Sequence, residues 1–186
     1  MPPRRRRVTS ARTLHLLVND REQVRPVGGN RIGEYIYLDG KARFLNYWSA
    51  TLHLDYEPPK YSHYLTRGGP IAFYPAGETV RGTLESDDRK PVVGRVEAFH
   101  FRNEHGSRQW EGEVVAELRP SSALTVAIGP ALMKASRVAQ WVTSVEDAAL
   151  PSDLAGHYVF SGFDQSEIAL TARVNWIFSP RLSLKL

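Results

Sequence analysis

The last twenty residues alternate between apolar and polar side chains, and this alternation predicts a β-hairpin. In "EIALTARVNWIF", which ends at residue 178, every second residue from Ile168 onwards is apolar and the row between is mostly polar. Successive side chains of a strand point to opposite sides, so a period of two indicates one apolar and one polar face. Ser179-Pro180 interrupts the run because proline has no amide hydrogen for a ladder. The leucines of "RLSLKL" then continue the alternation as a second arm.

The same alternation recurs upstream, in runs separated by turn and loop signals. We expect strands in residues 31–38, 41–57, 92–101, 109–118 and 124–129. Asp39-Gly40 predicts a hairpin turn between the first two runs. Residues 57–78 are rich in proline, glycine and tyrosine, which predicts a long loop around a short strand. The run over 41–57 exceeds the about five or six residues of typical soluble strands and suits a membrane-crossing strand better.

Residues 130–145 are the exception to the alternating pattern. Val138, Trp141, Val142 and Val145 lie at helical spacing, and Pro130 is suited to the first turn of a helix. Pattern alone leaves strand and helix open for this segment.

Connections of two kinds join the predicted strands. The turns in "RPSSA" (119–123) and at Ser179-Pro180 are short, whereas residues 57–78 form a long connection. Short turns at one rim and long loops at the other are typical of a transmembrane barrel. We therefore predict an all-β fold, an antiparallel meander of about eight strands that forms part of an outer-membrane-type up-and-down β-barrel. Residues 31–186 would be this partial barrel domain, with the apolar rows towards lipid and the polar rows towards the lumen.

The basic character of the chain comes from its start. The 186 residues carry a formal net charge of +4, but five arginines precede the first acidic residue, Asp20. Acidic and basic residues nearly balance in the rest, so we expect no nucleic-acid partner. Residues 1–30 have no convincing period and are expected to be a disordered or unrelated leader. The apolar stretch "LHLLV" is too short for a recognisable signal peptide, and no apolar run reaches the about 18 residues of a transmembrane helix.

Few residues form a pattern typical of a catalytic or metal-binding site. The chain has no cysteine, which excludes disulfides and thiolate metal sites. Glu111, Glu113 and Glu117 share one face of a predicted strand and are the candidates for acid–base chemistry, although such a row is usually a solvated face. The histidines show no metal-ligand spacing. They are His15, His53, His63, His100, His105 and His157. We therefore expect no catalytic residue, no metal site, no cofactor and no enzymatic activity.

Three segments resemble a known bacterial family. They are "LTRGGP" (65–70), "AQWVTSVED" (139–147) and "HYVFSGFDQSEIALTARVNWIFSPRLSL" (157–184). They are similar to the C-terminal region of domain-of-unknown-function family 5916, and the resemblance runs from about residue 31 to the end. Members of that family resemble outer-membrane barrels and usually place a family-nine-like carbohydrate-binding domain before the barrel. The resemblance favours an extended conformation for "AQWVTSV", entering a long external loop.

The resemblance implies a location and an architecture rather than an activity, because the family has no established catalytic residues. It implies the outer membrane of a Gram-negative bacterium for the parent protein, with the lipid bilayer as partner. The role would be structural or transport-associated, and linked to carbohydrate binding or uptake in the full-length parent. In the family, more barrel precedes and follows the matching region, so the chain is expected to be a fragment that lacks the remainder of its barrel. The bound or transported molecule is not identified.

Two other interpretations fit the same residues. A soluble up-and-down barrel would turn the apolar rows inward around an apolar small ligand. An enzyme would use the glutamate row as its site. Membrane strands carry tryptophan and tyrosine near their ends, and Tyr47, Trp48, Trp110 and Trp176 partly follow that rule.

Overall fold

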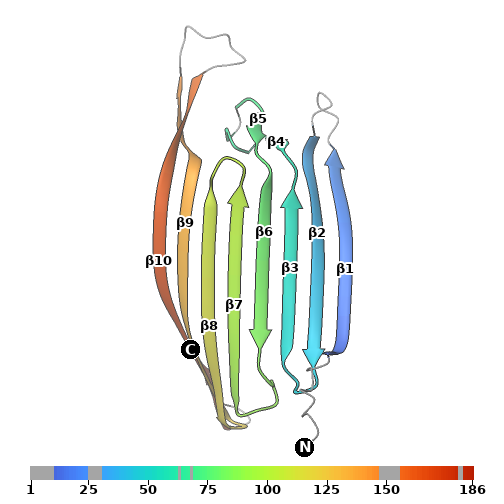
Figure 1. Ribbon diagram of the computed structural model, residues 1–186. Helices are drawn as coiled ribbons and strands as arrows, with labels where there is room; N and C mark the ends of the chain where they lie inside the picture. Colours follow the sequence, from blue (N-terminus) through green and yellow to red (C-terminus); the bar gives the residue numbers. More distant parts are fainter. Residues whose placement is uncertain (1–10, 25–30, 63, 68, 147–155, 180–181) are drawn as a thin grey trace, which may run out of the picture.

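A computed structural model of the chain contains only β-strands as regular elements (Figure 1). It describes residues 11–24, 31–62, 64–67, 69–146, 156–179 and 182–186. The strands are β1 (Ala11–Val24), β2 (Arg31–Phe44), β3 (Ser49–Glu57), β4 (Lys60–Ser62), β5 (Ala72–Tyr74), β6 (Gly77–Glu85), β7 (Val92–Asn103), β8 (Arg108–Ser121), β9 (Leu124–Glu146), β10 (Gly156–Ser179) and β11 (Leu182–Lys185). The described residues include no helix long and apolar enough to span a membrane.

Nine of these strands form one sheet, in which each strand pairs antiparallel with its neighbours in the order β1-β2-β3-β6-β7-β8-β9-β10-β11. The remaining two, β4 and β5, form a small hairpin of their own within the connection from β3 to β6. The prediction of an all-β antiparallel meander is therefore confirmed.

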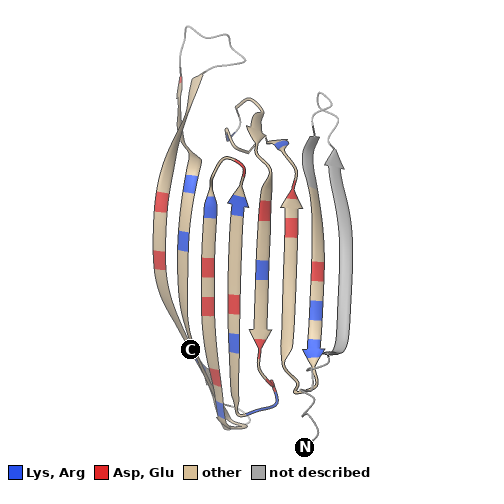
Figure 2. Ribbon diagram, in the orientation of Figure 1, with Lys and Arg blue, Asp and Glu red and all other residues tan. Residues whose placement is uncertain are grey.

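The pairing register divides the sheet into two faces. From β2 to β10, outside the register shifts, even-numbered positions pair with even-numbered positions and are mostly apolar, whereas the odd-numbered positions, which pair with one another, carry most of the charged residues. The apolar face contains Ile36, Leu38, Leu52, Leu54, Val80, Leu84, Val96, Trp110, Val114, Leu118, Val126, Ile128, Leu132, Ile168, Leu170 and Trp176. The polar face contains Lys41, His53, Asp55, Arg81, Arg95, Glu97, Glu111, Glu113, Glu117, Glu167 and Arg173. Figure 2 shows charged residues along the middle of β7 and β8.

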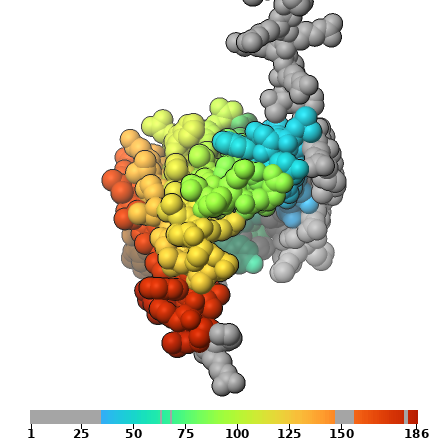
Figure 3. Space-filling view, turned by 90° about the horizontal axis from the view of Figure 1, so that it is seen from below, coloured from blue at the N-terminus to red at the C-terminus, as the bar shows by residue number. Residues whose placement is uncertain are grey.

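Curvature of the sheet, seen along the strands in Figure 3, gives these two faces different surroundings. On β7 the exposed positions alternate with less exposed ones: Val96 is 46% exposed, whereas its neighbour Glu97 is half-buried. Val114 and Ile128, on β8 and β9, are 52% and 44% exposed. Side chains splay apart on the outside of a curved sheet and crowd together on the inside. The apolar face is therefore convex and the polar face concave.

The sheet has no second layer, and its surface is correspondingly large. The chain of 20.9 kDa exposes 14085 Å², compared with about 9,000 Å² expected for a compact monomer of that mass. Among the described residues only Ala76, Val93 and Ala135 are buried hydrophobic residues. Much of the apolar surface is thus left without a protein partner.

The two ends of the sheet differ. At one end, here called the turn rim, the connections are 45–48, 86–91 and 122–123. The opposite end, the loop rim, carries the connection of residues 58–76 and the shorter turn 104–107. There β9 and β10 continue beyond β8, whose pairing with β9 begins at Arg108 and Ser136. Residues 137–146 and 156–163 pair only with each other, and they are called the arm below (Figure 1).

The hairpin turn predicted at Asp39-Gly40 is wrong. Both residues lie inside β2, and the turn to β3 falls at 45–48. Both residues stay in the strand because they pair with β1 on one side and with β3 on the other, and the carboxylate Oδ1 of Asp39 lies 2.6 Å from Nδ1 of His53 on the concave face. The turn chemistry is supplied instead by Asn46, whose side-chain oxygen accepts a bond from the Trp48 N–H, and by Tyr47, whose φ is +67°.

Two other segments differ from their sequence pattern. Residues 11–24, expected to be part of a leader, form β1, and the register pairs Leu14, Leu16 and Val18 with β2; residues 1–10 and 25–30 lie outside the described part. Residues 130–145, whose spacing allowed a helix, belong to β9. The ladder with β10 extends from one end of the segment to the other, with register shifts near 138–139 and 142. Pairing therefore decides its conformation, and the extended form implied by the resemblance is confirmed.

A charged cluster fastens the turns of the turn rim together. Nε and Nη2 of Arg89 donate to the two carboxylate oxygens of Asp87, each at 2.8 Å, and Asp87 is buried. The Arg89 guanidinium lies 3.2 Å from the centre of the Tyr47 ring. Arg43 reaches Asp88 at 3.3 Å. The 86–91 turn is thereby tied to the turn between β2 and β3.

Asp87 should keep the 86–91 turn ordered down to low pH. The hydrogen bonds from Arg89 lower the pKa of Asp87 to about 2 from an unfolded value near 3.9. Because the folded pKa is the lower one, the contribution is complete above about pH 4 and is lost as the pH falls through about 2. The difference in unfolding free energy between the parent and Asp87→Asn should therefore stay constant down to about pH 4 and shrink below it. Asp88→Asn, one residue away, should give a smaller difference; a larger one would contradict the assignment.

Candidate functional site

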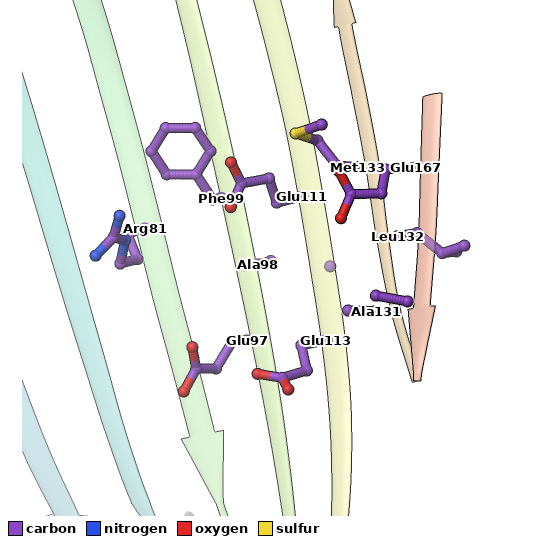
Figure 4. A pocket seen from close by; sticks show the side chains of 12 residues that line it. Arg81, Glu97, Ala98, Phe99, Glu111, Glu113, Ala131, Leu132, Met133 and Glu167 are labelled. Atoms are coloured by element: carbon purple, nitrogen blue, oxygen red, sulfur yellow. The ribbon is translucent and has the colours of Figure 1, made fainter. Parts of the chain in front are cut away.

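A hollow of about 470 Å³ lies on the concave face, over the middle of β6 to β10. The side chains around it come from five successive strands (Figure 4). They include Arg81, Glu97, Phe99, Glu111, Glu113, Met133 and Glu167. Each strand contributes alternate residues, because only every second side chain points to this face. Four carboxylates and one guanidinium thus surround the hollow.

The register sets how these carboxylates face one another. Glu97 and Glu113 are directly opposite on β7 and β8. Glu111 pairs with Met133, which in turn pairs with Glu167, so an apolar thioether separates the next two carboxylates. Like charges directly opposite one another destabilise a sheet, so this arrangement has a cost in stability. Because four carboxylates and one guanidinium line the hollow, its net charge is negative and attracts cations from solution.

Positive charge is distributed unevenly around this region. The Arg81 guanidinium lies over the Phe99 ring at 5.3 Å. Towards the turn rim, Arg95 contacts Glu97 at 3.3 Å and Arg119 contacts Glu117 at 2.6 Å. Arg173 lines a second hollow of about 270 Å³ there. The concave face is thus acidic in its middle and mixed in charge towards the turn rim.

The three glutamates share one face of β8, as their alternation predicted, and in the structure this face is the concave one. Glu111 and Glu113 line the larger hollow, whereas Glu117 is held by Arg119 outside it. The arrangement brings two of the three candidates for acid–base chemistry together. The expectation that the protein has no catalytic residue remains a prediction.

The histidines are spread over both faces. His53 pairs with Asp39 on the concave face, a pair that the sequence interpretation missed because Asp39 was assigned to a turn. The rings of His100 and Trp110 contact each other on the apolar face, with ring centres 3.8 Å apart and planes tilted by 35°. His105 lies in the 104–107 turn near Phe73. The side chains of His15 and His63 lie outside the described residues, and no group of three or more His, Asp or Glu suited to a metal ion occurs among the described ones.

Comparison with known proteins gives no match. No family model matches the sequence, and neither the curated proteins nor the solved structures contain a significant relative. The resemblance to domain-of-unknown-function family 5916 therefore stays a prediction.

Proposed function

We propose that the chain forms part of the wall of a bacterial outer-membrane β-barrel, with its convex face in lipid and its concave face lining an aqueous lumen. Its role is structural or transport-associated, and the chemistry of the chain's own residues is not catalytic. The lipid bilayer is its principal partner. The observation that carries the proposal is a set of uncharged rows on the convex face.

These rows have the length that a membrane requires. On β7, β8, β9 and β10 the convex positions within residues 92–100, 110–118, 124–132 and 168–176 carry no Asp, Glu, Lys or Arg. Nine residues extend about 30 Å along a strand, or about 23 Å across a membrane if the strands tilt by roughly 40°. The apolar band of membrane barrels is about 25 Å tall. Lipid is the partner that matches this surface.

Residues at the borders of the rows support the same partner. Tyr56 and Trp110 lie at the loop-rim end of the convex face, and Trp48 and Trp176 at the turn-rim end. Each of the four is at least 39% exposed. Charged residues continue the rows beyond Trp110: Arg108 precedes it, and Arg102 binds Glu78 at 2.7 Å on the neighbouring strands. Aromatic girdles flanked by charge are typical of the two membrane interfaces.

The soluble ligand-binding barrel is less well supported. Such a barrel encloses its ligand among inward-facing apolar side chains. Here the inward positions carry the charged residues of the polar face, and the apolar rows lie on the outside of the curve. A water-exposed apolar band of this extent is unfavourable unless lipid or protein covers it.

Spin labels placed one at a time along residues 110–118 test the proposal in lipid vesicles. The absence of cysteine from the chain makes each single-cysteine variant specific. Even-numbered positions should be relaxed by lipid-dissolved oxygen and odd-numbered positions by a water-soluble nickel chelate, so that the two accessibilities alternate with a period of two. Equal nickel accessibility on both faces would refute the membrane assignment. Oxygen accessibility at the odd-numbered positions and nickel accessibility at the even-numbered ones would show that the concave face, not the convex one, lies in lipid.

A further inference from the structure

The long connection at the loop rim contacts strands that are not its neighbours. It joins β3 to β6, which are paired in the sheet, yet the Arg67 guanidinium lies 4.7 Å from the centre of the Trp141 ring on β9. Gly69 lies against the ring of Tyr158 on β10, so closely that a Cβ at position 69 would overlap it. In the sheet, β7 and β8 separate β6 from β9. Neighbouring strands are about 4.8 Å apart, so the connection reaches across roughly 14 Å.

Hydrogen bonds within the tip of this connection stabilise its conformation. Thr66 is 4% exposed, and its hydroxyl donates to the Pro70 carbonyl at 2.7 Å. The Arg67 N–H donates to the Tyr64 carbonyl, and the Gly69 N–H donates to the Thr66 carbonyl. Arg67 adopts a left-handed φ of +49°, which is uncommon for a residue with a side chain and persists where the surroundings fix it.

The turn between β7 and β8 supports the connection from below. The Glu104 N–H donates to the Ala76 carbonyl at 3.0 Å. The rings of Phe73 and His105 lie 6.1 Å apart. On the other side of the same turn, the hydroxyl of Ser107, a buried residue, accepts a bond from the Val138 N–H of the arm. The connection, the turn and the arm therefore form one continuous structure.

The connection meets the arm on its concave side. Arg137 lies on the concave side, over the Phe101 ring at 5.1 Å. The β9–β10 ladder then has a register shift before Gln140, so the side that Trp141 faces follows from its burial and its contact with Arg67. Trp141 is half-buried, whereas Val138 and Val142 are more than half exposed. The contact with Arg67 thus lies on the inner side of the curve, above the ends of β7 and β8.

We propose that the β3–β6 connection, through residues 64–67 and 69–76, is a fixed constriction across the loop-rim mouth of the concave face. It limits the size of solute that reaches the acidic hollow below it. The residues that fasten it are Arg67 and Gly69 of the connection, Trp141 of β9 and Tyr158 of β10, whose roles alternation alone did not explain. The effect on passage along a lumen rests on the proposed function. The position of the connection does not, and it is tested independently.

The position of the connection is tested by a distance between two spin labels in vesicles. The labels replace Tyr64, which is 85% exposed, and Val142, which adjoins Trp141. The parent should give a short distance with a narrow distribution. Gly69→Val should lengthen and broaden it, because the added atoms overlap Tyr158, whereas Gly94→Val, where an added Cβ meets no atom within 4 Å, should leave it unchanged. A broad parent distribution, or no effect of Gly69→Val, would overturn the proposal.

The effect on access is measured in the assembled barrel in lipid vesicles, at a cysteine in place of Met133, which lines the hollow. In the parent a small thiol reagent should react quickly and a bulky one slowly. Gly69→Val and Arg67→Ala should each accelerate the bulky reagent several-fold and leave the small one unchanged. Arg67→Ala adds no atoms and therefore creates no overlap, so it provides the same test if the Gly69→Val variant does not fold. Equal rates for the bulky reagent in parent and variants would refute a constriction, while failure of the oxygen-accessibility pattern would refute only the membrane location.

Discussion

Replacement of Val114 by arginine is expected to destabilise the membrane-embedded protein by about 2–4 kcal/mol, the cost of arginine on the lipid face near the bilayer midplane. Val114 is the central residue of the uncharged row over 110–118 and is 52% exposed on the convex face. The residue opposite it on β7 is Val96, and the convex rows within 92–100, 110–118 and 124–132 carry no acidic residue that could neutralise a guanidinium. Penalties of this kind fall towards the interfaces, so arginine at Trp110 or Leu118 should cost less.

The matched control is the same substitution one residue further along. Val115 faces the concave side, between Glu113 and Glu117 on the same strand. Arginine at this position lies beside two carboxylates on β8 but directly opposite Arg95 on β7, so Val115→Arg should cost no more than about 1 kcal/mol, less than Val114→Arg. Urea-induced unfolding from lipid vesicles, followed by tryptophan fluorescence and circular dichroism, measures both variants. If both substitutions cost the same, or Val115→Arg costs more, the convex face does not lie in lipid.

The strands could be predicted from the sequence because a side-chain period of two leaves a direct trace in the order of residues. Residues 92–101 and 109–118 fall within β7 and β8, and the pairing of the terminal hairpin follows the leucines of "RLSLKL". The same trace does not indicate which face is convex. An alternating strand looks alike in a soluble and in a membrane barrel, and here the exposures of neighbours such as Val96 and Glu97 make the distinction.

The turns and the loop rim were less predictable because non-local contacts determine them. Asp39-Gly40 has the composition of a hairpin turn, but pairing with His53 and Leu52 keeps both residues in β2. The helical spacing within 130–145 has no effect because β10 pairs with the segment from one end to the other. The stacking of Arg67 on Trp141 joins residues more than seventy positions apart. No local pattern of residues predicts such a contact. The glycine at position 69 agrees with it, because a larger residue there would overlap the Tyr158 ring.

The chain is expected to aggregate in aqueous buffer and to remain in solution as a single species in mild detergent. Exposed apolar residues spread over the convex face from β2 to β10, and patches beyond a few hundred Å² are rarely left to water. The outer edges of β1 and β11 add unpaired backbone groups, which template association between chains. Light scattering and sedimentation with and without detergent measure the difference. A monodisperse monomer in plain buffer would contradict the expectation and favour the soluble barrel.

Charged substitutions separate the contribution of the face from that of the edges. The triple variant Leu52→Glu, Val96→Glu and Ile128→Glu alters three residues that are 46%, 46% and 44% exposed on the convex face. It should remain soluble without detergent for longer than the parent and lose binding to lipid vesicles, because glutamate is poorly tolerated in hydrocarbon. The matched triple variant Thr51→Glu, Thr125→Glu and Thr171→Glu places the same charges on the polar face, opposite Lys41, Asn175 and Gly129, and should change neither property. If the convex triple variant aggregates as readily as the parent, the open edges rather than the apolar face drive the association.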